Sequence, residues 1–175
     1  MTSFFELLKT RRSIRKYLPK AVEPDKISQI IQAALMSPAS KRSNPWEFII
    51  VQDKEMLVKL SECRPHGSQM LAESPLGIIV IADKTKSDIW IEDASIAAII
   101  MQLQAQDLGL GSCWIQVYGR EKDEHTTAEK YICELFDVPE KYSVLCIVSI
   151  GYPNEERKPF DIEKLATDKI HSEKF

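Results

Sequence analysis

The stretch from residue 88 to residue 117 constrains the fold of this chain more than any other. Residues 94–101 are apolar on nearly every side of a helix, whereas a surface helix shows a single apolar stripe. The segment is too short to cross a membrane, which takes about 20 mainly apolar residues. Asp88 is the predicted N-cap, and Gly109 suits the left-handed residue that ends a helix. We therefore expect a central helix buried on more than one face, followed by an apolar strand over 112–117.

Hydrophobic patterns on either side of this unit predict further helices and strands. The predicted helices cover residues 3–9, 24–35, 54–63 and 128–136, and the predicted strands cover 48–51, 76–82 and 144–150. Because about four strands alternate with several helices, we expect an α+β fold, an α/β sandwich with helices over a central sheet. No linker or internal repeat divides the chain, so residues 1–175 form one predicted domain, in which 154–175 is a charged tail.

Composition argues against several classes of protein. With 175 residues, 44% of them hydrophobic and 28% charged, the chain has the make-up of a soluble globular domain. Its net charge of -3 argues against a nucleic-acid partner. The first residues lack the continuous apolar region of a signal peptide, and no stretch predicts a transmembrane helix. The four cysteines form no C-x-x-C pair and indicate free thiols, so we expect a cytoplasmic protein.

One cationic cluster is a candidate binding site. Arg11, Arg12 and Arg15 surround Ser13, and guanidinium groups with a hydroxyl suit a phosphate, because arginine provides charge and paired donors together. The alternative is a solvated run of cations that offsets a helix dipole. The three histidines lie far apart in the sequence, so no metal site is expected. No nucleophilic or acid–base constellation stands out, so an enzyme built on this chain would depend on a cofactor.

Four motifs, in order along the chain, resemble the nitroreductase family of FMN-dependent oxidoreductases. They are R-R-S-I-R-K-Y at 11–17, S-P-A-S-K-R-S-N-P-W-E-F at 37–48, L-G-L-G-S-C-W-I at 108–115, and G-Y-P followed by R-K-P within 151–159. The resemblance spans nearly the whole chain. It implies a nitroreductase-like sandwich with a central mixed sheet, an intertwined homodimer with two flavins at its interface, and a tail that wraps the partner subunit.

The resemblance also implies a set of FMN-binding residues. Phosphate ligands are expected at Arg11 and Ser13, with Arg12 adjacent and Arg157 or Lys158 completing the phosphate site. Arg15 takes the position beside the flavin ring where a cation stabilises the reduced form. The remaining expected contacts are Pro38, Ala39, Ser40 and Asn44 in a loop of the partner subunit, Gln69 at the edge of the ring, and Gly111, Ser112, Cys113, Trp114 and Ile115 along the ring.

The expected function follows from the same resemblance. It implies that NADH or NADPH reduces FMN and that a nitroaromatic, quinone or similar acceptor then takes the electrons, a ping-pong reaction without a side-chain acid or base. Three alternatives stay open: a protein that stores or senses FMN without turnover, a flavoenzyme with a narrow and unrelated substrate, and a dimeric scaffold with solvated cations. Arg42 and Phe160 depart from the family pattern, in which asparagine and a second basic residue are frequent.

Overall fold

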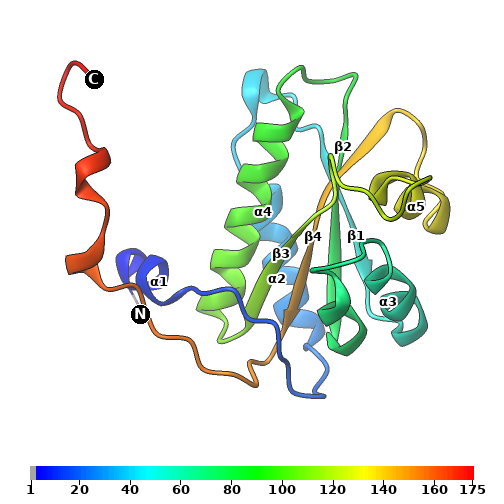
Figure 1. Ribbon diagram of the computed structural model, residues 1–175, viewed down its shortest axis with the longest axis horizontal. Helices are drawn as coiled ribbons and strands as arrows, with labels where there is room; N and C mark the ends of the chain where they lie inside the picture. Colours follow the sequence, from blue (N-terminus) through cyan, green and yellow to red (C-terminus); the bar gives the residue numbers. More distant parts are fainter. Residues whose placement is uncertain (1–2) are drawn as a thin grey trace.

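The computed structural model of the chain describes residues 3–175 and contains one four-stranded sheet (Figure 1). The strands are β1 (Trp46–Val51), β2 (Leu76–Asp83), β3 (Gly111–Gln116) and β4 (Tyr142–Gly151), in the order β1-β2-β4-β3. All three pairings are antiparallel. The parallel component of the expected mixed sheet is confined to an isolated bridge between Ser13 and Ser112. β3 is therefore an edge strand that the N-terminal segment touches near its start.

Helices cover both faces of this sheet, which confirms the predicted α+β sandwich (Figure 1). On one face lie α2 (Pro24–Leu35) and α4 (Trp90–Asp107), and on the other lie α3 (Lys54–Ser61) and α5 (Ala128–Leu135). Successive side chains of a strand point to opposite faces. In β2, Ile78 and Val80 accordingly pack with α2 and α4, whereas Ile79 and Ile81 pack with α3 and α5. Burial on both faces explains why β2 is apolar without interruption.

The predicted central helix is α4, which packs against α2 and the sheet. Its residues Ala97, Ala98 and Met101 are fully buried there. On another side of the helix, Ile96 and Ile99 remain 38% and 40% exposed. The helix is therefore apolar beyond the face that this chain covers, and the chain by itself only partly meets the expected burial on more than one face.

The two ends of α4 differ in how well the sequence predicts them. The Asp88 cap is wrong: the cap position is Ile89, whose side chain cannot accept a hydrogen bond, and the helix begins at Trp90, whose indole ring is buried in the core. Gly109 follows the helix with a φ of 75°, the left-handed conformation that glycine adopts without strain. The glycine at the C-terminal end is therefore confirmed.

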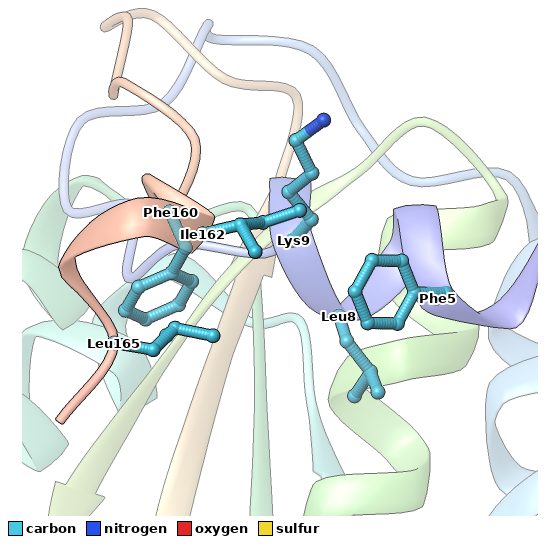
Figure 2. Close-up of a pocket in the computed structure, with 6 residues that line it drawn as sticks. All are labelled: Phe5, Leu8, Lys9, Phe160, Ile162 and Leu165. Atoms are coloured by element: carbon cyan, nitrogen blue, oxygen red, sulfur yellow. The ribbon is translucent and has the colours of Figure 1, made fainter. Parts of the chain in front are cut away.

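The segment after β4 forms an exposed arm that runs past α1 (Phe4–Thr10) and away from the sheet (Figure 1). Every residue from 156 to 175 is exposed, including the short turns η3 (Ile162–Lys164) and η4 (Thr167–Lys169). Between arm and helix lies an apolar groove of about 210 Å³. Figure 2 shows its lining residues, which are Phe5, Leu8 and Lys9 of α1 and Phe160, Ile162 and Leu165 of the arm.

Candidate FMN-binding site

Four arginines and a serine surround a polar hollow beside the arm. The hollow has a volume of about 260 Å³, and its lining residues are Arg11, Arg12, Ser13, Arg15, Arg157 and Phe160. The first four follow α1, whereas Arg157 comes from the segment after β4. The predicted cationic cluster thus gains a further guanidinium from the other end of the chain. This donor set, guanidinium groups together with a hydroxyl, fits the phosphate of a nucleotide cofactor.

Glu155 holds these two segments together. One carboxylate oxygen accepts the backbone N–H of Arg15 at 2.5 Å and that of Lys16 at 3.2 Å, and the other pairs with Nη2 of Arg157 at 2.6 Å. Burial by itself would raise the pKa of Glu155, but the N–H donors and the Arg157 guanidinium hold that pKa below its ordinary value. The carboxylate fixes both the backbone under Arg15 and the direction of Arg157. Sequence reasoning missed Glu155, because a contact across 140 residues leaves no local signal in the sequence.

Arg12 is oriented by a carbonyl group and an aromatic ring. Its Nη1 donates to the Lys158 carbonyl at 2.6 Å, and its guanidinium carbon lies 4.6 Å from the centre of the Phe160 ring. The second contact is a cation–π interaction. Of the two residues expected to complete the phosphate site, Arg157 lines the hollow, whereas Lys158 supplies the carbonyl that orients Arg12. Phe160, which stands where a second basic residue is frequent in the family, therefore orients the neighbouring Arg12 and adds no positive charge of its own.

The cationic segment meets the sheet at the start of β3. The N–H of Ile14 donates to the Ser112 carbonyl at 3.0 Å, beside the bridge between Ser13 and Ser112. Gly111 permits this approach, because a Cβ atom there would lie 2.7 Å from Cβ of Ile14, closer than such atoms come in proteins. The glycine thus serves the packing of Ile14, and through it the position of Ser13.

The remaining expected residues of β3 lie in different surroundings. Cys113 and Ile115 are buried, whereas Trp114 is partly exposed and its Nε1 donates to Oε1 of Gln116 at 2.9 Å. Burial raises the pKa of the Cys113 thiol, although the Arg15 charge and a hydrogen bond with Ser13 act in the opposite direction. The thiol therefore stays protonated at neutral pH beside the cationic cluster.

Gln69 lies in the loop between α3 and β2 and shapes that loop with its own amide group. The amide oxygen accepts the N–H of Gly67 at 2.8 Å, and the amide nitrogen donates to the Arg64 carbonyl at 3.3 Å. Arg64 in turn donates from Nη1 to the Gln116 carbonyl at 3.2 Å. The structure therefore brings the Gln69 loop to the end of β3. Arg64 and Gln116, which make that contact, were not among the predicted site residues.

The loop over residues 38–44 lies beside the N-terminal end of α4. It contains the turn η1 (Ser40–Arg42) and is tied to the helix by Asp93, which is only 2% exposed. The Asp93 carboxylate accepts the N–H of Ser40 at 2.8 Å and the hydroxyl of Ser87 at 2.9 Å. One loop therefore carries four of the expected contacts, Pro38, Ala39, Ser40 and Asn44.

Within one chain, this loop and the cationic hollow lie far apart. Thr10, next to the cationic segment, receives a long hydrogen bond of 3.5 Å from Nε2 of Gln106 in the last turns of α4. Asp93 lies in the first turn of the same helix. Since an α-helix rises 1.5 Å per residue, roughly 20 Å separates Asp93 from Gln106 along the axis. A single chain does not bring all the expected residues into one site.

Residues 3–175 contain neither a candidate metal site nor a candidate membrane-spanning helix. In this part of the chain no group of three or more His, Cys, Asp or Glu side chains is arranged to hold a metal ion. None of its helices combines the length and hydrophobicity needed to cross a lipid bilayer. All four cysteines are free thiols, as the sequence predicts, and a cytoplasmic location stays a prediction.

The family model described as the nitroreductase family matches residues 8–64 and 58–152. A relative from Archaeoglobus fulgidus, provisionally named NADH dehydrogenase/NAD(P)H nitroreductase, is 37% identical over 180 aligned residues that cover all of both chains. A protein from Bacillus subtilis named FMN reductase (NAD(P)H) is 27% identical over 91% of this chain and 70% of its own.

Solved structures agree with these matches. An FMN-dependent nitroreductase from Clostridium difficile R20291 superposes with a TM-score of 0.97 at 53% identity, over 98% of this chain and 100% of that one. A nitroreductase family protein from Clostridium difficile 630 gives a TM-score of 0.84 at 28% identity, over 99% and 100% of the two chains. Sequence and structure therefore agree over nearly the full length, and this chain belongs to the nitroreductase family.

Proposed function

We propose that this chain is an FMN-dependent oxidoreductase that transfers electrons from NADH or NADPH to a nitroaromatic, quinone or similar small-molecule acceptor. The cationic hollow carries the proposal, because four guanidinium groups and the Ser13 hydroxyl converge on a space suited to the FMN phosphate. Two similar proteins carry names that agree with it, the FMN-dependent nitroreductase of Clostridium difficile and the FMN reductase of Bacillus subtilis.

The residues of the chain would bind and orient, and need not act as acids or bases. When bound, FMN supplies the redox chemistry that reductant and acceptor use in turn, a ping-pong reaction. Arg11, Arg12, Ser13 and Arg157 line the hollow that would hold the phosphate. Arg15, whose backbone is fixed by Glu155, is the cation proposed to stabilise negative charge on the reduced ring.

We further propose a homodimer in which each site draws on both subunits. The hollow and the loop over 38–44 lie at opposite ends of α4, so a second copy running antiparallel would bring its loop to this hollow. The apolar side of α4 and the groove in Figure 2 provide a surface for that copy, since Ile99, Phe5 and Leu165 are 40%, 57% and 49% exposed. The arm then has a partner surface to wrap.

The visible absorption spectrum of the purified protein, recorded before and after anaerobic NADH or NADPH, tests the proposed cofactor and reductant. We expect a flavin spectrum that bleaches on addition and returns when an acceptor is added. A flavin spectrum that does not bleach would favour storage or sensing of FMN, and a protein that stays colourless with added FMN would contradict the assignment.

Sedimentation of the purified protein tests the proposed homodimer. A species of 20.0 kDa, the mass of one chain, would contradict a site shared between two subunits.

A further inference from the structure

The loop over residues 38–44 carries two adjacent cations that the phosphate hollow does not use. Lys41 and Arg42 are both exposed. Neither side chain takes part in any of the ion pairs formed within residues 3–175. They lie on the loop that the proposed dimer would bring to the site of the other subunit. Their charges are therefore available to a ligand at that site.

The backbone of this loop is unfavourable for the residues it contains. Lys41 and Arg42 have φ values of 51° and 56°, and Asn44 has a φ of 42°, all in the left-handed region. Glycine or asparagine adopts this conformation with less strain than lysine or arginine. A loop that only had to turn would place those residues at 41 and 42. This chain instead carries two long cationic side chains at these strained positions, which points to a use for their charge.

The buried carboxylate of Asp93 supports this conformation. It accepts the N–H of Ser40 at 2.8 Å, immediately before the two cations, and the Ser43 hydroxyl at 3.4 Å, immediately after them. The backbone that carries Lys41 and Arg42 is thereby fixed at both ends. Because this backbone is fixed, less conformational entropy is lost when the two side chains bind a ligand than if they stood on a mobile loop.

We propose that Lys41 and Arg42 select a carboxylate or phosphate group on the molecule that exchanges electrons at the site. The inference rests on the proposed function, since it places the loop of one subunit over the flavin of the other. Arginine pairs with either anion through two parallel N–H groups, and lysine adds a compact positive charge. The same chemistry has two possible sources, a carboxylate-bearing acceptor or the 2′-phosphate of NADPH.

The test uses the FMN-loaded protein and the double variant Lys41→Asn/Arg42→Asn, because asparagine tolerates the left-handed backbone. Lys59→Gln is the matched control, an exposed lysine on α3 that also lies outside the ion pairs of the described chain. Binding of 4-nitrobenzoate and of its neutral analogue 4-nitrobenzamide to the oxidised protein is measured by calorimetry, without reductant. A second arm compares the concentrations of NADPH and of NADH that half-saturate the rate of flavin bleaching.

For an anionic acceptor, the double variant should bind 4-nitrobenzoate about tenfold more weakly and leave 4-nitrobenzamide within about twofold, since each screened ion pair contributes a few-fold. For NADPH as the source, the half-saturating NADPH concentration should rise about tenfold while that of NADH is unchanged. Lys59→Gln should alter neither comparison. If the double variant does not fold, Arg42→Asn alone carries both measurements, with about half the effect on a logarithmic scale.

Failure of the proposed anion recognition and failure of the proposed function give different experimental results. Flavin-loaded protein in which neither comparison changes would overturn the role of Lys41 and Arg42 while leaving the proposed function intact. Protein that takes up no FMN would overturn the proposed function and this inference together. A matching loss for 4-nitrobenzamide would also overturn the inference, because it would show damage to the loop instead of loss of charge recognition.

Discussion

The carboxylate of Glu155 lies 2.5 Å from the backbone nitrogen of Arg15, although 140 residues separate the two in the sequence. The same carboxylate pairs with Arg157. It therefore joins the segment that leaves α1 to the segment that leaves β4, the two that line the cationic hollow. A negative charge beside a phosphate site opposes the ligand's charge, so its presence requires a structural benefit. We attribute that benefit to the fixed positions of Arg15 and Arg157.

Glu155→Gln tests whether this positioning outweighs the repulsion. Glutamine keeps one acceptor oxygen, but its NH₂ group cannot pair with Arg157. Because hydrogen bonds to charged groups contribute about 1.5–3 kcal/mol each, we expect FMN to bind about tenfold more weakly or worse. The dissociation constant is measured by fluorescence titration of the apoprotein. Glu156→Gln, at the exposed neighbouring residue, is the control. Tighter binding in Glu155→Gln would show that charge repulsion dominates.

Gly111→Ala tests the contact that positions the cationic segment on β3. The new Cβ atom would meet Cβ of Ile14 at 2.7 Å, and a backbone-attached atom cannot rotate away. Overpacking of this kind costs about 1–3 kcal/mol, and here it also displaces Ser13. We expect a lower free energy of unfolding in urea together with weaker FMN binding.

Gly77→Ala is the control for that variant. Its Cβ atom would lie 3.1 Å from Cδ2 of Leu57, the far end of a flexible side chain. The loss of stability should be smaller, and FMN binding should be unchanged. Equal effects of the two variants on FMN affinity would contradict a specific role for the contact between Gly111 and Ile14.

The sequence predicts the parts of this fold that depend on local patterns. The run of apolar residues in β2, the apolar helix α4 and the left-handed Gly109 each have a local physical cause, and each is found where expected. The N-cap of α4 is predicted at Asp88 but lies at Ile89, and the burial of the Trp90 ring at the start of the helix is a tertiary contact that the local pattern does not reveal.

The candidate site is predictable only in part, for the same reason. Arg11 to Arg15 form a local cluster that the sequence shows directly. Glu155 joins them through a contact across 140 residues, and the Phe160 ring lies under Arg12 from the far end of the chain. Asp93 is not among the predicted site residues, yet it is buried and holds the loop over 38–44. Long-range pairings of this kind leave no periodic signal in one sequence.

Tyr17→Phe tests the anchoring of the segment that follows the cationic cluster. The Tyr17 hydroxyl is buried, donates to the Ile14 carbonyl at 2.7 Å and lies 2.8 Å from Oγ of Ser149. Phenylalanine would remove both contacts and leave the buried Ile14 carbonyl without this donor, which costs about 1–3 kcal/mol. We expect that loss in the free energy of unfolding. Tyr118→Phe, at a residue 40% exposed, should change the free energy by less than about 0.5 kcal/mol. Equal losses in the two variants would contradict the anchoring role.

Acid unfolding should reveal the carboxylate of Asp83, whose side chain is 3% exposed. The hydroxyl of Thr85 donates to it at 2.6 Å and Lys141 pairs with it at 3.2 Å, which lowers the pKa of Asp83 from 3.8 to about 2. A carboxyl with a lowered pKa in the folded state stabilises the protein fully above its unfolded pKa, and this contribution is lost as the pH falls through the folded pKa. The window for Asp83 therefore runs from about pH 4 down to about pH 2.

Glu23 also has its pKa lowered to about 2, mainly by the Tyr152 hydroxyl, so it adds to the acid sensitivity of the protein. Because Glu23 contributes equally in the wild-type protein and in Asp83→Asn, the difference between these two proteins isolates the effect of Asp83. Free energies of unfolding are measured in urea at intervals from pH 6 to about pH 2.5. The advantage of the wild-type protein over Asp83→Asn should be constant above about pH 4.5 and should shrink steadily below it. An advantage that stayed constant to the lowest pH would show that Asp83 titrates alike in the folded and unfolded chains, and that the contacts with Thr85 and Lys141 do not favour its charged form.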